Sequence, residues 1–254
     1  MNVFVTGASS GIGAATAVAF AAAGHTVGVC ARREDRLAEV VERCGADARM
    51  WVADLSDLDS LDALIARVDD ELGGIDVLVN NAGVPKRRRV QAMSPDDVEG
   101  VMAMNYFSPV RLTLAALPRM VARGSGEIVN VSSMGVHSAA FGVGAYSATK
   151  AALEIFTESL YLELADTGVR ARVLVPGTTR TEFSDEKPGN DPSMIRNAPN
   201  AATAEQVAAA IVGSLGDDRF ILYATDGDAQ GSAQKAADPN AFLSTAREAL
   251  KAYL

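Results

Sequence analysis

The stretch NVFVTGASSGIGAATAVAF (residues 2–20) places three glycines between a β-branched apolar run and an alanine-rich run. A strand, a glycine turn and a helix in this order are typical of the first unit of a parallel α/β sheet. Gly7, Gly11 and Gly13 permit a tight turn and let the phosphates of a ligand approach the start of a helix over 11–23. Because such a turn can also be a plain βα corner, a ligand site needs support from the rest of the chain.

The same alternation of strand and helix continues along the chain. Short apolar runs predict strands over 2–6, 26–30, 48–52, 75–80, 127–132, 170–175 and 219–223. Periodic runs predict helices over 11–23, 33–43, 57–72, 95–122, 145–167 and 203–214, with another near 239–253. Near-continuous apolar strands are typical of a sheet that is covered on both faces. We therefore expect a Rossmann-like, doubly wound parallel sheet of seven strands in a three-layer α/β/α arrangement.

One domain is expected to span residues 1–254, since no linker, repeat or low-complexity tract interrupts the alternation. The segment 176–202 is rich in Pro, Asn, Asp and Gly. An irregular segment of that length inside a compact domain predicts a substrate lid. Residues 224–254 follow the last expected strand and form a C-terminal extension.

The composition and net charge argue against several kinds of binding partner and cellular location. The 254 residues carry a net charge of −9, which argues against nucleic acid and against a membrane surface as partners. No apolar run approaches the ~20 residues of a spanning helix, and the first residues enter a strand without the pattern of a secretion signal. Cys30 and Cys44 are expected as reduced thiols, and the His and Cys spacing indicates no metal site. A cytoplasmic location is the expectation.

The end of the second expected strand bears on which dinucleotide this edge of the sheet would bind. A carboxylate at this point would bind both ribose hydroxyls of NAD and repel a 2′-phosphate. The chain has Ala31 here, followed by Arg32 and Arg33. Arginine bonds to a phosphate contribute about 1.5–3 kcal/mol each, which favours NADP(H), with NAD(H) as the alternative. The other interpretation is a solvated helix start, although Glu34 and Asp35 suit that role better.

Two further segments fall at the carboxyl ends of expected strands, where ligands bind in folds of this kind. Asp54 follows the third strand and could accept a hydrogen bond from an adenine amino group, or serve as a turn residue. The run NNAG (80–83) follows the fourth strand and brings Asn81, Ala82 and Gly83 to the same edge.

A tyrosine and a lysine lie one helical turn apart in YSATK (146–150). Side chains at i and i+4 share a helix face, so Tyr146 and Lys150 can reach one region of space. An ammonium within ~4–6 Å favours a phenolate and would bring the tyrosine pKa closer to working pH, where acid–base catalysis is efficient. Ser133 ends a strand at the same edge, and its hydroxyl could polarise a carbonyl. For the Tyr–Lys pair alone, the alternative is a surface helix pair.

Taken together, these motifs resemble those of the short-chain dehydrogenase/reductase family. The matching segments, in family order, are TGASSGIG (6–13), NNAG (80–83), Asn105 in VMAMNYFSPV, Ser133 in VNVSS, YSATK (146–150) and PGTTRT (176–181). The resemblance implies an oxidoreductase that moves a hydride between NADP(H) and a ketone, an aldehyde or an alcohol.

By this resemblance, Tyr146 is the general acid or base, and Lys150 lowers its pKa and binds the nicotinamide ribose. Ser133 orients the substrate oxygen and is preferred over Ser132 because it lies thirteen residues before Tyr146. Asn105 holds a water that extends a proton path to Lys150.

The resemblance also implies cofactor contacts on the loops at the carboxyl edge. The set is Gly7, Ser9, Ser10, Gly11, Ile12, Gly13, Arg32, Arg33, Asp54, Leu55, Asn81, Ala82, Gly83, Tyr146, Lys150, Pro176, Gly177, Thr179 and Thr181. Many NADP(H)-preferring members carry a basic residue beside the glycine turn, where this chain has Ser9 and Ser10. NADP(H) therefore stays the expectation, with NAD(H) open.

The remaining expectations concern the oligomeric state, the substrate pocket and a basic run. The resemblance implies a homodimer or homotetramer that uses the helices over 95–122 and 145–167. The candidate pocket or lid residues are Phe141, Phe183, Met194 and Ile195. Such side chains would suit a fairly apolar ketone or alcohol and would exclude water from a hydride transfer. The basic run Lys86–Arg89 could contact an acidic substrate or the cofactor, or be a solvated face.

Two other function classes remain open. One is a non-catalytic dinucleotide-binding sensor on the same fold, against which the intact Ser133, Tyr146 and Lys150 speak. The other is an epimerase or dehydratase that retains its nicotinamide, which would require a larger substrate domain than these 254 residues contain.

Overall fold

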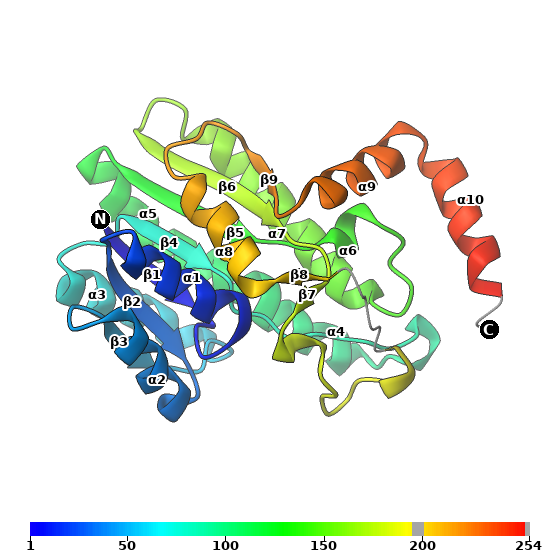
Figure 1. Cartoon of the computed structure of the whole chain (residues 1–254), viewed down its shortest axis with the longest axis horizontal. Helices are drawn as coiled ribbons and strands as arrows, with labels where there is room; N and C mark the ends of the chain where they lie inside the picture. The colour runs from blue at the N-terminus through cyan, green and yellow to red at the C-terminus, as the bar shows by residue number, and fades with distance from the viewer. Residues whose placement is uncertain (195–200, 252–254) are drawn as a thin grey trace.

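The computed structural model describes residues 1–194 and 201–251. Seven parallel strands form one sheet in the order β3-β2-β1-β4-β5-β6-β9 (Figure 1). In chain order the strands are β1 (Asn2–Thr6), β2 (Thr26–Ala31), β3 (Arg49–Val52), β4 (Val77–Asn80), β5 (Gly126–Val131), β6 (Val169–Val175) and β9 (Ile221–Tyr223). The order reverses between β1 and β4, and ligands of doubly wound sheets bind at such a reversal.

Helices cover both faces of the sheet. One face is covered by α1 (Gly11–Ala22), α2 (Glu34–Cys44) and α8 (Ala204–Gly213), and the other by α3 (Leu61–Leu72), α5 (Ser108–Arg123) and α7 (Gly144–Glu163). Phe20 and Ile211 are buried in the first core, and Leu112 and Leu160 in the second. The central strands are apolar without alternation because both of their faces are covered. The predicted three-layer α/β/α class is confirmed.

The continuous helix predicted over 95–122 is wrong. It consists of α4 (Pro95–Met102) and α5, joined by a π-helical turn over Ala103–Phe107. A π-helical turn inserts one residue into the helical repeat, so it leaves almost no trace in the apolar periodicity, and it is frequent at functional sites. This turn carries Asn105, whose side chain is fully buried.

Other element boundaries differ from expectation by a few residues, as when α7 ends at Glu163 instead of 167. Besides short 3-10 turns, the described residues contain elements that were not predicted: α6 (Met134–His137), α9 (Asp226–Ala237) and a two-stranded sheet of β7 (Thr179–Arg180) and β8 (Ala202–Thr203). Helix α10 (Pro239–Leu250) matches the helix expected near 239–253, whose last two residues lie outside the described part. The expected lid segment 176–202 contains β7 and the start of β8, and its residues 195–200 are not described.

The C-terminal extension divides into two helices with different surroundings. Helix α9 packs against α6 and β9, and the Lys235 ammonium donates to the Val136 carbonyl at 2.6 Å. Helix α10 has no buried residue and extends away from the body of the molecule in Figure 1. Only the first half of the extension therefore reaches the loop that follows β5.

Residues 1–194 and 201–251 contain neither a membrane-spanning helix nor a cluster of metal-binding side chains. No helix in this part of the chain has both the length and the apolar character needed to cross a lipid bilayer. No three His, Cys, Asp or Glu side chains in it are grouped so that they could hold a metal ion.

Candidate functional site

The turn between β1 and α1 is packed so closely that two of its positions require glycine. Gly7 has φ +65°, and a Cβ there would lie 2.7 Å from the Cα of Ala82. A Cβ at Gly13 would lie 2.5 Å from both the Gly7 carbonyl and the Asn81 side-chain amide. Asn81 fixes this contact by donating to the Thr6 carbonyl at 2.9 Å. The predicted glycine turn therefore lies directly against the segment that follows β4.

The start of α1 can hold an anionic group. Gly11 has φ +56°, and its missing Cβ would lie 3.1 Å from Thr181 of the lid segment. Ser10 is the N-cap of α1 but makes no side-chain cap bond, and the first turn holds no acidic residue. The free N–H groups and the helix dipole remain for a phosphate, so this cradle fits the pyrophosphate of a dinucleotide. The Ile12 side chain packs against the core instead.

Arg33 turns back toward the glycine turn. Its guanidinium donates to the Ser9 hydroxyl at 3.0 Å and to the Ser10 hydroxyl at 2.8 Å. Glu182, from the segment after β7, pairs with the same guanidinium at 2.9 Å, and this contact lowers the pKa of the Glu182 carboxyl. The structure thus brings together three predicted cofactor residues and adds a carboxylate that sequence reasoning missed.

Three other residues of the predicted cofactor set, Arg32, Asp54 and Leu55, are not brought to the glycine turn by any contact among the described residues. Arg32 and Asp54 are exposed, and their charged groups lie 3.9 Å apart. Asp54 Oδ1 accepts from the Ser56 N–H at 3.0 Å and from its hydroxyl at 2.7 Å, which lowers the pKa of Asp54. This is the turn role that the sequence left open. The Leu55 side chain is buried in the core, so only its backbone could face a ligand.

The two serines after β5 have different partners. Ser132 donates to the carboxylate of Glu154 on α7. Ser133 is the N-cap of α6 and accepts from the Gly135 N–H at 3.0 Å. A Cβ on Gly135 would lie 3.4 Å from the Ser133 hydroxyl and 3.7 Å from the Tyr146 ring, so both side chains border the same space. The structure therefore places Ser133, and not Ser132, beside the tyrosine.

The polar groups of Lys150 and Asn105 both lie next to Gly83. A Cβ at Gly83 would lie 3.2 Å from Asn105 Oδ1 and 3.7 Å from Lys150 Nζ, so a side chain there would fill the space between them. Lys150 is buried, and its ammonium donates to the Val131 carbonyl at 2.7 Å. Asn105 exchanges two hydrogen bonds with the Val84 backbone, at 2.8 and 3.0 Å. The amide and the amine are thus both fixed by backbone groups.

The expectation that Lys150 lowers the pKa of Tyr146 stays a prediction, since other groups account for the shift of this phenol here. Burial raises the pKa of the Tyr146 phenol, and the groups that oppose this shift are the Ser133 hydroxyl and the Arg87 guanidinium. The Lys150 amine is held by a strand carbonyl, and burial lowers its own pKa to about 8 against the opposing charge of Glu154. Arg87, a member of the unassigned basic run, thus contributes a positive charge near the tyrosine.

The segment after β6 is held by the helices that flank it. The Pro176 carbonyl accepts from the Met134 N–H at 2.9 Å, and Thr179 is buried in β7. Gly177 lies so close to Asp228 of α9 that any Cβ would collide with the carboxylate. Sequence reasoning missed α9, and the signal that could have found it is the Thr-x-x-Asp cap at its start.

One of the candidate pocket residues, Phe183, lies beside the tyrosine. The Phe183 ring centroid lies 5.8 Å from that of Tyr146. Met194, from the same lid segment, packs against the backbone next to Phe141. Ile195, the fourth candidate, lies outside the described residues.

Comparisons with known proteins agree with this arrangement. A family model described as short chain dehydrogenase matches residues 1–191. An uncharacterized oxidoreductase of Mycobacterium tuberculosis is 37% identical over 222 residues, and the match covers 84% of this chain but only 63% of the relative. The chain therefore spans less than two thirds of the length of the curated relatives it matches first.

Two solved structures have the same fold over almost the whole chain. A short-chain dehydrogenase from Streptomyces avermitilis has a TM-score of 0.84 and 31% identity, covering 99% of this chain and 97% of that one. A short-chain dehydrogenase from Sphingobium yanoikuyae, solved in complex with NADPH, has a TM-score of 0.80 and 29% identity, covering 100% and 96%. The chain therefore belongs to the short-chain dehydrogenase/reductase family, a family of oxidoreductases that bind NAD(P).

Proposed function

We propose that this protein is an NADP(H)-dependent oxidoreductase that interconverts a ketone or aldehyde and an alcohol, with Tyr146 as the general acid or base. The observation that carries the proposal is the position of the Ser133 hydroxyl and the Tyr146 phenol beside Gly135, on the same sheet edge as the glycine turn. A proton donor is thereby set beside a cradle that fits the pyrophosphate of a dinucleotide.

The nicotinamide, when bound, would supply or accept the hydride. The protein would handle the proton: the Tyr146 hydroxyl donates it to the carbonyl oxygen during reduction and takes it back during oxidation. The raised pKa of Tyr146 keeps the phenol protonated at neutral pH, which suits reduction. The Ser133 hydroxyl would hold the same oxygen by a hydrogen bond and stabilise its developing negative charge.

Lys150 and Asn105 are proposed to resupply this proton. Their polar groups lie next to Gly83, and a water between them would find both a donor and an acceptor. A Lys150 pKa of about 8 lets the amine give and take a proton near working pH. Binding of the nicotinamide ribose is a second role proposed for Lys150.

The NADP(H) preference is proposed from Arg32 and Arg33. The Arg33 guanidinium, held by Ser9 and Ser10 beside the glycine turn, would bind a 2′-phosphate by charge-assisted hydrogen bonds. The NADPH complex of the Sphingobium relative supports this choice. The remaining residues of the predicted contact set are proposed to bind the rest of the dinucleotide.

The proposed substrate is a small molecule with a fairly apolar body, because Phe183 packs against Tyr146 at the mouth of the site. A homodimer or homotetramer through the α4–α5 and α7 helices is proposed, since α5 and α7 expose large apolar side chains. The cytoplasm is the proposed location, because NADPH and small-molecule substrates are both available there.

The test is a panel of ketones and alcohols, with NADPH and NADH, followed by the near-ultraviolet absorbance of the reduced nicotinamide. We expect Tyr146→Phe to lose at least about a hundredfold in kcat while NADPH still binds, because only the acidic proton is removed. Turnover that survives in Tyr146→Phe would refute the proposed proton donor. A wild type that binds NADPH but oxidises or reduces nothing would favour the sensor instead, and an unchanged cofactor balance during turnover would favour an epimerase.

A further inference from the structure

The basic run Lys86–Arg89 contains one cation whose surroundings differ from those of its neighbours. The Lys86 ammonium and the Arg88 guanidinium both pair with Asp97, each at 2.7 Å. These two cations therefore share one carboxylate on α4. Arg87, between them, points to a different part of the molecule.

The Arg87 side chain is fixed beside the catalytic tyrosine. Its two terminal nitrogens both donate to the Phe183 carbonyl at 3.2 Å, and its guanidinium lies 5.7 Å from the centroid of the Phe183 ring. That ring is itself 5.8 Å from the Tyr146 ring. The backbone of Arg87 is also held, since its N–H donates to Asn190 at 2.5 Å and its carbonyl accepts from Asp191 at 2.7 Å.

Within residues 1–194 and 201–251, no carboxylate forms an ion pair with this guanidinium. Arg87 is partly buried, and among the described residues its guanidinium donates to one neutral carbonyl and to no other acceptor. A guanidinium has five N–H donors, so several remain available, and a half-buried charge without a counter-ion is unfavourable. An anion that enters the site would satisfy both the donors and the charge.

We propose that Arg87 binds a carboxylate of the substrate, so that the preferred substrates are oxo acids or the corresponding hydroxy acids. This inference rests on the proposed function, because it places the carboxylate a few bonds from the carbonyl that Tyr146 protonates. Phe183 supplies the apolar wall between the two polar ends. Burial lowers the pKa of Arg87, which agrees with a charge that is poorly solvated before the anion binds.

The two other roles for Arg87 predict different outcomes. As an anchor of the lid alone, it would affect all substrates equally, because the bonds to the Phe183 carbonyl form with any of them. As a ligand of the cofactor phosphates, it would have to lie at the glycine turn, where Arg33 already lies. The carboxylate role alone makes the effect depend on the charge of the substrate.

The experiment compares two matched substrate pairs, acetoacetate with methyl acetoacetate and levulinate with methyl levulinate, by NADPH consumption. In each, the carbonyl accepts the hydride and a proton to become an alcohol, and only the carboxylate charge differs within the pair. We expect the wild type to favour at least one acid over its ester about tenfold or more in kcat/KM. Arg87→Gln should lower that acid's kcat/KM about thirtyfold and the ester's less than about threefold. Arg88→Gln, whose guanidinium pairs with Asp97, is the matched control and should keep the wild-type ratio.

A second measurement separates this inference from the proposed function. Butanoate, which carries no reducible carbonyl, is titrated by calorimetry into the NADP⁺-loaded protein, with methyl butanoate as the uncharged probe. We expect butanoate binding to weaken about tenfold or more in Arg87→Gln and to persist in Arg88→Gln. Equal losses for acid and ester, a wild type that favours the esters, or butanoate binding that ignores Arg87 would each overturn the inference. If no ketone consumes NADPH while butanoate binding still depends on Arg87, the proposed reaction fails and the anion site stands.

Discussion

At the scale of single residues, Glu182 places a carboxylate where Arg33 would meet a cofactor phosphate. The two groups are 2.9 Å apart, and the same guanidinium is held by Ser9 and Ser10. A 2′-phosphate that binds Arg33 must therefore displace Glu182 or repel it. Because both side chains are more than two-fifths exposed, this competition is screened by water and weak.

The first prediction is that Glu182→Gln strengthens NADPH binding by about two- to fivefold, since an exposed ion pair contributes at most ~1 kcal/mol. NADH lacks the 2′-phosphate, so its affinity should change less. Fluorescence titration with both cofactors at low salt measures the two affinities. Glu186→Gln, an exposed residue of the same segment, serves as the control. An equal gain for NADH, or no gain for NADPH, would show that Arg33 does not receive the 2′-phosphate.

At the scale of elements, α7 carries Tyr146, Lys150 and Glu154 along one face, because each lies four residues from the next. Burial lowers the pKa of Lys150 from its ordinary 10.5 to about 8, with Glu154 opposing the shift. Between these two pKa values the unfolded chain binds more protons than the folded protein. The free energy of unfolding therefore rises with pH across that window.

We accordingly expect the free energy of unfolding of the wild type, relative to Lys150→Met, to rise by roughly 2 kcal/mol between pH 8 and pH 10. Burial raises the pKa of Tyr146 from its ordinary 10.0, so its titration begins to act at the top of this window, and it cancels from the difference because both proteins contain Tyr146. Urea denaturation of the cofactor-free protein at a series of pH values gives the difference. Lys187→Met, at a partly exposed lysine of the lid segment, should follow the wild type. If the Lys150→Met curve also runs parallel to the wild type, the buried amine does not titrate in this range.

The spacing of apolar residues predicted the main strands and helices, because each element buries one or both of its faces and the buried positions recur at a fixed interval within that element. It could not predict the π-helical turn at Asn105, which changes the repeat by one residue. The motifs located Ser133 and Tyr146, since one strand end and one helix fix their spacing. The partners of Arg87 and Arg33 could not be predicted from the sequence. Those contacts join residues 96 and 149 positions apart, and they depend on how the lid segment folds.

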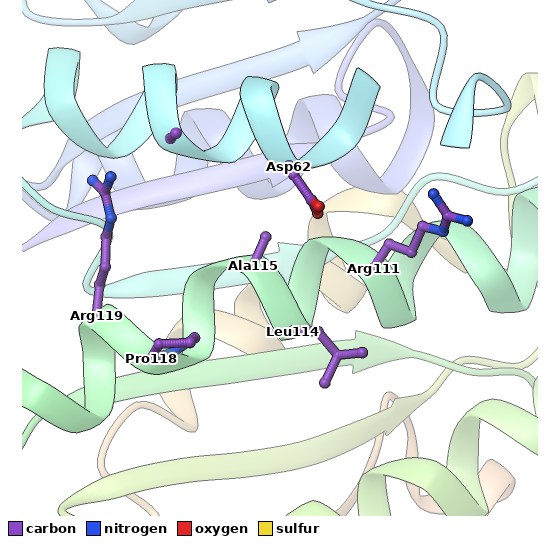
Figure 2. A pocket seen from close by; sticks show the side chains of 7 residues that line it. Asp62, Arg111, Leu114, Ala115, Pro118 and Arg119 are labelled. Carbon is purple, nitrogen blue, oxygen red and sulfur yellow. The ribbon is translucent and has the colours of Figure 1, made fainter. Parts of the chain in front are cut away.

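At the scale of the whole molecule, the outer surface of the α5–α7 layer is rich in apolar side chains. Leu114 and Val121 on α5, and Ile155 and Leu162 on α7, are 40–66% exposed. Each pair is seven residues apart, so its members lie on one stripe of their helix. Figure 2 shows Leu114 at a groove between α3 and α5, which contains none of the predicted site residues. An exposed apolar stripe away from the site indicates contact with another protein surface.

The stripe on α7 makes the proposed oligomer testable with one substitution. A two-fold axis brings the same patch of both copies together, so Leu162→Glu would place two carboxylates in the contact, at a cost of roughly 2–5 kcal/mol. We expect the molar mass from light scattering after size exclusion to fall at least twofold relative to the wild type, while NADPH binding persists and shows that the variant is folded. Val52→Glu, at a half-exposed position of the edge strand β3, should leave the mass unchanged. A wild type that is already monomeric, or a Leu162→Glu variant of unchanged mass, would mean that α7 is not the contact and that its apolar stripe faces water.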